Sequence, residues 1–285
     1  MPCLIAFFDT RRFQPLLPTT HYITHYITHT YTMAWRCSAT TNTLLIQNLS
    51  ASSLISHPLA VDALLRVDRA HYAPRNPYDD RPQSIGHGAT ISAPHMHATA
   101  LSELAPFLAQ ATGGALTPRR ALDVGSGSGF LTHAMAELCL LSAEQMSPST
   151  PPLITVIGID HTPQLIALST SNLSKSARGE AHLSSRTIRF RAADGRAGYI
   201  DTDDGTGGPG ARYDAIHVGA AAAECHAALL EQLNSPGRMF IPLVDDFGEQ
   251  HVWRIEKDAE GQITRKKLFG VKYVPLTDAA YYEKL

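Results

Sequence analysis

Short apolar runs alternate with stretches of helical spacing through the second half of the chain. The apolar runs, typical of buried strands, lie at 121–124, 154–159, 187–192, 213–218 and 238–243. Helical spacing fills three of the intervals, at 130–141, 163–174 and 222–233. Strands that alternate with helices indicate a mostly parallel, doubly wound sheet with right-handed crossovers. The pattern therefore predicts an α/β fold.

The chain before this alternation has a different pattern. Two stretches with helical character, 43–49 and 58–67, predict an N-terminal helical segment, the second opened by Pro58. Residues 68–88 are crowded with Pro, Asn, Asp and Gly, which predicts a long ordered loop. After Pro94, apolar residues again follow helical spacing, and "TGG" at 112–114 should stop that helix.

The chain after the alternation turns to strands. "HVWRIE" and "KKLFGVKYVPL" predict an antiparallel strand pair that closes one edge of the sheet. Two polar segments, 142–152 and 201–211, are interpreted as surface insertions.

Composition narrows the class of protein. A chain of 285 residues with 44% hydrophobic content can bury a full core. The net charge of −2 and the lack of a dense Lys/Arg run argue against a nucleic-acid partner. The four cysteines form no CxxC pair, which disfavours a disulfide framework or a zinc site and favours a reducing, cytoplasmic setting. No apolar run approaches the roughly 20 residues of a membrane-spanning helix.

The first 32 residues differ from the rest and end in the low-complexity run "HYITHYITHTYT". They make a poor secretory signal, because no basic residue precedes "CLIAFF". We interpret residues 1–32 as a disordered extension or an upstream-start artefact, with Met33 as an alternative start. Organised sequence then runs over 33–285.

A glycine-rich turn follows the first strand of the alternation, in "LDVGSGSGF" at 122–130. Gly125, Gly127 and Gly129 allow a tight turn and a close approach of a ligand, and the next helix offers free N–H groups. Such a turn can also need glycine for packing alone, so by itself it is weak evidence for a ligand.

Three acidic residues strengthen the prediction of a ligand site. Asp123 precedes the first glycine by two residues, Asp160 ends the second strand and Asp194 ends the third. In a parallel sheet all three reach the carboxyl edge, where such sheets bind their ligands. Any one of them could simply cap a helix or turn. Together they favour a ligand that carries hydroxyls and a positive charge.

The spacing of the loop favours one ligand over another. The NAD fingerprint is G-x-G-x-x-G, whereas here Phe130 stands in the place of the last glycine. An acid as close as Asp123 would also repel a pyrophosphate. S-adenosylmethionine has no phosphate, offers a ribose diol to Asp160 and carries a cationic sulfonium that tolerates Asp123. We therefore expect S-adenosylmethionine as the cofactor.

Several segments together resemble one family. "NPYDDRPQSIG", "TISAPHMHA", "LDVGSGSG", "VIGIDH", "AADG", "YDAIHVGAAA" and "GVKYVPLTD" closely resemble protein-L-isoaspartate (D-aspartate) O-methyltransferases. The similarity runs from Met33 to 278 except for the two insertions, and "TISAPHMHA" followed by the glycine loop is its most specific part. The resemblance implies a class I methyltransferase domain over 33–285, with a helical prelude and substrate loop at 33–115 and a cofactor-binding core with closing strands at 116–285.

The resemblance also implies an activity. A methyl group would pass from S-adenosylmethionine to the free carboxylate of an isoaspartyl residue in a damaged protein, which begins its repair through a succinimide. The protein would act as a cytoplasmic monomer on isoaspartyl peptides and proteins, with D-aspartyl sites left open.

Site residues follow from the same resemblance. Ser92 would be the catalytic serine and would meet the substrate together with His95. The cofactor would contact Ser92 and thirteen further residues: Ala89, Thr90, Ile91, His97, Asp123, Gly125, Ser126, Gly127, Asp160, His161, Asp194, Gly195 and Thr277. Among these, Asp123 and the glycine loop would hold the methionine end, Asp160 the ribose and Asp194 the adenine region.

The residues around Ser92 also bear on three other roles: a hydrolase nucleophile, a helix cap and a metal site. A hydrolase serine would need a G-x-S-x-G turn, which "TISAP" lacks. Ser92 could instead cap the helix that Pro94 opens, and a helix N-terminus also favours a carboxylate. His95 and His97 point to different sides of a helix and have no evident third ligand, so we expect no metal. His217, in a buried strand pattern, is expected to be a core histidine.

Three alternatives remain for the function. The chain could be an S-adenosylmethionine methyltransferase with a small-molecule substrate, although such an enzyme has no need of the long 68–97 segment. It could be a non-catalytic binder of isoaspartyl proteins, against which the intact Ser92, Asp123 and Asp160 argue. A dehydrogenase is disfavoured by the spacing of the glycine loop.

Overall fold

The computed structural model describes residues 37–109, 116–202 and 212–276. Its centre is a seven-stranded sheet in the order β5-β4-β3-β6-β7-β8-β9. The first five strands in this order are parallel, namely β5 (Ile188–Ala192), β4 (Ile154–Asp160), β3 (Arg119–Val124), β6 (Tyr213–Val218) and β7 (Leu233–Val244). The last two, β8 (Gln250–Lys257) and β9 (Ile263–Val271), are antiparallel. The predicted α/β fold with a closing antiparallel pair is confirmed.

Alternate residues of each central strand enter two separate cores. Ala121 of β3 and Val156 of β4 belong to the larger core, and their neighbours Leu122 and Ile157 to the smaller. This alternation follows from the two-residue period of a strand, because both faces of a parallel sheet are covered. The runs therefore appear as nearly continuous apolar segments, as the sequence shows.

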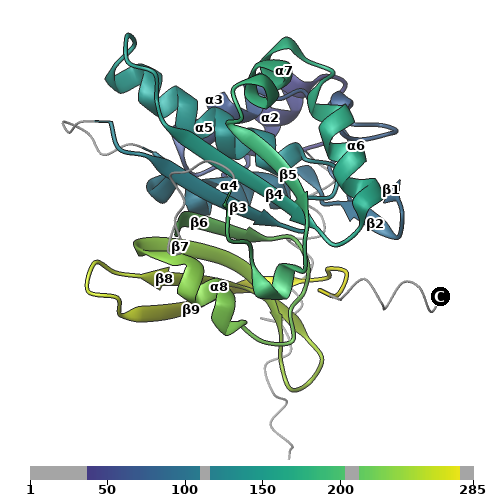
Figure 1. The fold of residues 1–285 in the computed structure, drawn as a ribbon. Coiled ribbons are helices and arrows are strands. Elements are labelled where there is room, and N and C mark those ends of the chain that lie inside the picture. The colour runs from purple at the N-terminus through teal and green to yellow at the C-terminus, as the bar shows by residue number, and fades with distance from the viewer. Residues whose placement is uncertain (1–36, 110–115, 203–211, 277–285) are drawn as a thin grey trace, which may run out of the picture.

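Helices cover the two faces unequally (Figure 1). The larger core lies under α4 (Pro94–Leu108) and α5 (Phe130–Met146). The N-terminal helices α2 (Asn42–Ala51) and α3 (Pro58–Arg66) form a further layer, since α3 packs on α5. The other helices are α6 (Pro163–Leu173) and α7 (Ala177–Ser184) near β5, and α8 (Ala227–Gln232), whose Leu229 enters the smaller core.

The segment expected to be a long loop contains regular structure. Residues 69–71 form a 3-10 turn, η1 (Arg69–His71), and the strands β1 (Gln83–Gly86) and β2 (Ala89–Ile91) form a two-stranded hairpin. His87 and Gly88, at its turn, both have positive φ, 53° and 69°. This is the backbone of a tight hairpin turn, and histidine is not a residue that usually signals one.

Two predicted boundaries in the second half were wrong, and one helix was not predicted. Residues 142–146 continue α5, so that only the later part of the expected insertion at 142–152 is a loop. The helix expected at 222–233 is reduced to α8. The short helix α7 was not expected, because its sequence "ARGEAHLS" is largely polar. The expected leader, the "TGG" stop and most of the 201–211 insertion lie outside the described residues.

None of the helices within the described ranges is long and apolar enough to cross a membrane.

Candidate active site

A cleft opens at the carboxyl ends of the parallel strands. Four parts of the chain provide most of its lining: the hairpin turn at 87–90, the glycine loop, the end of β4 with the residues after it, and the C-terminal stretch 274–276. The last of these is held in place by Ala221, whose N–H donates to the Val274 carbonyl (2.8 Å) and whose carbonyl accepts from the Leu276 N–H (2.7 Å). The cleft thus joins segments from both halves of the chain.

The glycine loop is fixed to the neighbouring strand. The N–H groups of Gly125 and Ser126 both donate to the Ile159 carbonyl of β4, at 2.8 and 2.9 Å. Gly129 ends the loop in a left-handed conformation, with φ of 85°, and a Cβ there would lie 2.9 Å from the Phe190 ring. A residue with a side chain would therefore be strained and would collide, so only glycine suits this position.

Asp160 closes the same loop from β4. Its Oδ2 accepts from the Gly127 N–H (3.2 Å), and its Oδ1 accepts from the Thr162 N–H (3.1 Å). Burial raises the pKa of Asp160, although these two N–H groups oppose the shift. His161 follows, with its Nδ1 3.5 Å from Asp160 Oδ1. The carboxylate therefore orients the loop and also lines the cleft.

Asp123 was expected to reach the ligand at the carboxyl edge of the sheet, but its side chain lies behind the cleft. It is buried, and it is not among the residues that line the cleft. Its Oδ2 accepts from the Thr132 hydroxyl (2.6 Å), and its Oδ1 lies 2.8 Å from His217 Nδ1. His217 is thus the buried, hydrogen-bonded histidine that the sequence predicts, and its partner is a candidate site residue.

Ser92 lies just before α4 and does not cap it. The N-cap is Ala93, without a side-chain hydrogen bond, so the capping role considered for Ser92 was wrong. The Ser92 carbonyl accepts from Arg69 Nη2 (2.7 Å), and its side chain lies beside the Tyr273 phenol. Burial raises the pKa of Tyr273 to about 12 although Ser92 opposes the shift, so that the phenol stays protonated at neutral pH.

The two histidines of "PHMH" face different partners. His97 is buried, with Nδ1 3.1 Å from Arg69 Nη1, and its ring packs against that of Phe130 at an angle of 32°, with centroids 4.9 Å apart. His95 is partly exposed. Its ring Nδ1 lies 2.8 Å from Asp80 Oδ1, and its backbone N–H donates to the same oxygen at 2.9 Å. They do not converge on one point, as the sequence argument against a metal pair expects.

The predicted cofactor residues divide into two groups. Those that line the cleft are Ala89, Thr90, Gly125, Gly127, Asp160, His161 and Gly195. Those outside its lining are Ile91, Ser92, His97, Asp123, Ser126 and Asp194, while Thr277 lies outside the described residues. Asp194 instead caps a turn and pairs with the side chain of Arg196, with a shortest distance of 2.7 Å. Ligand contact by each residue stays a prediction.

Sequence reasoning missed Arg69, Thr132 and Tyr273. Arg69 sits in a polar stretch, "DRAHY", where nothing local indicates burial, and Thr132 lies in an apolar helix. Tyr273 belongs to a stretch quoted for the resemblance, although no role was assigned to it. For Thr132, the local signal is its spacing. It lies three residues after Gly129, and helical geometry places it near the end of the preceding strand.

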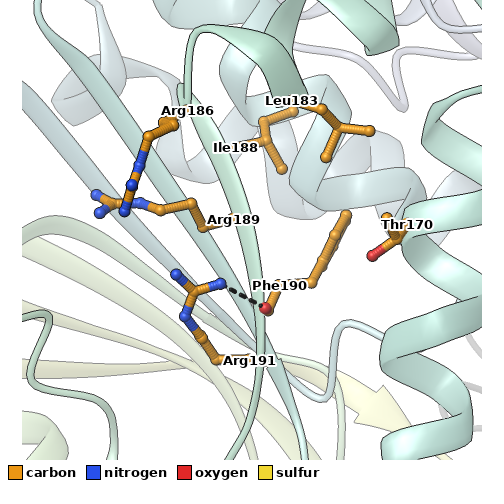
Figure 2. Close-up of a pocket in the computed structure, with 7 residues that line it drawn as sticks. All are labelled: Thr170, Leu183, Arg186, Ile188, Arg189, Phe190 and Arg191. Carbon is orange, nitrogen blue, oxygen red and sulfur yellow. Dashed lines mark hydrogen bonds between the residues drawn. The ribbon is translucent and has the colours of Figure 1, made fainter. Parts of the chain in front are cut away.

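A second hollow lies at the outer edge of the sheet, along β5. It has a volume of about 550 Å³ and is lined by Thr170, Leu183, Arg186, Ile188, Arg189, Phe190 and Arg191. Figure 2 shows the three arginine side chains on one side of the strand and Phe190, Ile188 and Leu183 on the other. None of the predicted site residues lines it.

A buried ionic cluster lies between α5 and α7. Ligand-type atoms of His133, Glu137 and His182 lie within 4.8 Å of one another. Arg178 donates to both Glu137 oxygens, at 2.9 and 2.7 Å, and His182 Nε2 lies 2.9 Å from Oε1. A carboxylate held in this way by an arginine fork is already neutralised, so we interpret the cluster as an ion-pair network. The expected absence of a metal stays a prediction.

Comparison with known proteins places these features in a family. A family model described as Protein-L-isoaspartate(D-aspartate) O-methyltransferase matches residues 40–281. A Caenorhabditis elegans protein-L-isoaspartate O-methyltransferase is 42% identical over 86% of this chain and 96% of its own, and one from Triticum aestivum is 38% identical over 83% and 91%.

A solved structure gives the same result. A Plasmodium falciparum structure, described as a protein-L-isoaspartate O-methyltransferase in complex with S-adenosyl-L-homocysteine, is 31% identical with a TM-score of 0.68. It covers 84% of this chain and 99% of its own. The matched residues include the hairpin, the glycine loop and the strands that frame the cleft. The chain belongs to the protein-L-isoaspartate (D-aspartate) O-methyltransferase family.

Proposed function

We propose that this protein transfers a methyl group from S-adenosylmethionine to the free carboxylate of isoaspartyl residues in damaged proteins. The observation that carries the proposal is the family match, which spans every described segment of the cleft. The Plasmodium falciparum relative, matched over almost all of its length, binds the demethylated form of this cofactor.

The lining of the cleft fits a cofactor of this kind. The described residues that line it include carboxylate and histidine side chains but no Lys or Arg. A ligand with phosphates would lack a charged partner there, whereas a ribose diol can donate to the Asp160 carboxylate. Gly195 allows this lining to pack closely, because a Cβ at this position would collide with Val124 and lie 3.3 Å from Leu276.

The chemistry asks little of a base. When bound, the cofactor supplies a methyl group on a positively charged sulfur. A carboxylate is ionised near neutral pH, so that its oxygen can form the new bond to the methyl carbon as the bond to sulfur breaks. The protein has to align the two groups and exclude water. This agrees with the lack of any base beside the Ser92 hydroxyl among the described contacts, where Tyr273 is its neighbour.

We assign the roles of the site residues on the same basis. Ser92 orients the substrate carboxylate through its hydroxyl, just before the start of α4. His95, partly exposed and held by Asp80, borders the substrate. Asp160 and His161 meet the nucleoside, and Asp123 acts on the methionine end from behind the glycine loop.

Partners and setting complete the proposal. The substrates are isoaspartyl peptides and proteins, and the balanced charge and the hydropathy pattern argue against nucleic acid and membrane as partners. Among the cysteines that the structure describes, Cys37, Cys139 and Cys225, no disulfide joins one to another, which suits a reducing cytoplasm. We propose that the protein acts as a monomer.

The deciding experiment uses a matched pair of peptides. The full chain is incubated with methyl-labelled S-adenosylmethionine and two peptides that differ only in an isoaspartyl or a normal aspartyl residue. We expect base-labile methyl ester on the isoaspartyl peptide alone. Label on neither peptide, or on both equally, would contradict the proposal. A small-molecule methyltransferase would bind the cofactor and label neither, whereas a non-catalytic binder would retain the isoaspartyl peptide without labelling it.

A further inference from the structure

Arg69 is a buried cation behind the predicted substrate loop. Only 1% of its surface is exposed, although it lies in the short turn η1 among polar residues. Its Nη2 donates to the Ser92 carbonyl (2.7 Å), its Nη1 lies 3.1 Å from His97 Nδ1, and its guanidinium carbon lies 5.2 Å from the centre of the Phe130 ring. Among the described residues, no carboxylate oxygen comes within ion-pair distance of it.

Burial destabilises the charged form of the Arg69 guanidinium, as the shift of its pKa shows. Burial lowers the pKa of Arg69 to about 9, and the more distant Asp80 opposes the shift. Arg69 therefore remains charged at neutral pH. A buried charge without an adjacent counter-ion is expensive, and such groups persist mostly where they orient other groups or take part in function.

The contact with His97 fixes the position of a proton. A guanidinium has only donors, so the nitrogen that faces it, Nδ1, must accept. A neutral imidazole that accepts at Nδ1 carries its hydrogen at Nε2. Burial, followed by the charge of Arg69 and the neighbouring His217 and His95, lowers the pKa of His97 well below its usual range. The imidazole is therefore neutral at physiological pH.

The same guanidinium joins three separate parts of the chain. Ser92 and His97 flank the start of α4, while Phe130 is the first residue of α5, directly after the glycine loop. The His97 ring and the guanidinium both contact the Phe130 ring, at 4.9 and 5.2 Å. The serine, the histidine and the helix that follows the loop are thus held to one buried group.

We propose that Arg69 is a positioning residue, which holds His97 as the Nε2-protonated tautomer and clamps the backbone of Ser92. His97 then presents a fixed N–H donor, and Ser92 keeps one orientation relative to the glycine loop. The effect on turnover rests on the proposed function, whereas the state of the His97 ring does not.

The direct test is nuclear magnetic resonance of the full-length wild-type protein with ¹⁵N-labelled imidazoles, the His97 signal being assigned with His97→Gln. From about pH 6 to 8, where a free histidine titrates, we expect His97 to remain neutral with its proton on Nε2. A proton on Nδ1, or a ring that charges in this range, would overturn the proposal. This measurement needs no Arg69 variant to fold and no methyl transfer to occur.

A pair of variants tests the consequence. Arg69→Met removes every donor at similar length, and Arg66→Met is its control, because Arg66 lies one turn earlier and pairs with Glu137 and Glu144 instead. With Arg69→Met we expect both tautomers of His97 and a fall in kcat/KM of about tenfold or more, the size of one charge-assisted hydrogen bond. Arg66→Met should retain the single tautomer and near-normal kinetics. An Arg69→Met protein with one Nε2 tautomer and the kinetics of Arg66→Met would refute the positioning role.

Discussion

The hydroxyl of Thr132 donates a 2.6 Å hydrogen bond to Asp123 Oδ2, within the first turn of α5. With His217 on the other oxygen, both oxygens of this buried carboxylate are held by side chains of the protein. Asp123 therefore ties the end of β3 to the helix that follows the glycine loop, and the role that we propose for it in the cleft would act through its negative charge.

Replacing Thr132 by valine should test this tie. The change keeps the shape of the side chain but leaves Asp123 Oδ2 without its donor, which should lower the free energy of unfolding by about 1–3 kcal/mol. Urea unfolding followed by circular dichroism measures it. Thr170→Val is the matched control, because Thr170 is exposed and its hydroxyl donates to a carbonyl of its own helix. Equal stability of the two variants would mean that the Thr132 bond contributes nothing.

Replacing Ser92 by alanine should separate binding from turnover. The hydroxyl contacts Tyr273 rather than the glycine loop, so the affinity for S-adenosylhomocysteine should stay near that of the wild type. The kcat with an isoaspartyl peptide should fall by roughly ten- to a hundredfold, the loss of one hydrogen bond to a charged group. Calorimetric titration and initial rates give the two quantities. Unchanged rates would remove Ser92 from the catalytic site.

Replacing Gly158 by alanine should disturb the cofactor loop from beneath. A Cβ at this position in β4 would lie 2.6 Å from the Phe190 ring and 2.9 Å from Ser126 Cβ. Such overpacking should lower stability by about 1–3 kcal/mol, and it should weaken binding of S-adenosylhomocysteine because Ser126 must move. Gly270→Ala in β9, where the nearest atom is 3.8 Å away, is the control. The two variants should differ in melting temperature and in Kd.

Glu137 should make the stability of the fold depend on acid pH. Burial raises its pKa, but the nearby His133 and the hydrogen bonds from His182 and Arg178 lower it more, so that the net pKa lies well below the usual range. A depressed folded-state pKa contributes stability above the unfolded-state value of about 4.3, and this contribution is lost as the pH falls through the folded-state pKa. At pH 7, Glu137→Gln should cost about 1–3 kcal/mol, because Arg178 and His182 lose the charged acceptor that they share.

The free energy of unfolding at acid pH tests the role of Glu137. In urea unfolding from pH 7 down to pH 3, the gap between wild type and Glu137→Gln should narrow as the wild type loses stability. Glu144→Gln removes a half-exposed partner of Arg66, so its curve should run parallel to that of the wild type. A constant gap for Glu137→Gln would mean that the folded and unfolded states bind protons equally in this range, which would contradict a depressed pKa of Glu137 in the folded state.

Features that depend on neighbours in sequence could be predicted. The sheet strands were evident because both faces are covered, which makes each run continuously apolar. The glycine loop and Asp160 follow from the order of strand and helix, and the structure brings them together in the cleft. The turn at His87 and Gly88 was missed because its left-handed histidine is not a usual turn signal.

Features that depend on distant partners could not be predicted. Arg69 owes its burial to Ser92, His97 and Phe130, which lie 23 or more positions away and share no local pattern with it. Asp123 was correctly placed at a strand end, yet its engagement with His217 depends on how β3 and β6 are paired. A single sequence shows which residues are candidates, whereas their partners require the assembled sheet.

The way in which Ala221 holds Val274 and Leu276 beside the hairpin turn has a consequence for folding. The cleft is lined by residues 87–90 and 274–276, which lie far apart in the sequence. These segments can meet only after the sheet between them has formed, because contacts between distant residues form late in folding. A ligand of this cleft therefore recognises molecules that have completed folding and, by mass action, withdraws them from the unfolding equilibrium. For a protein whose proposed task is to restore aged proteins, occupancy of its own cleft would thus also slow its own loss.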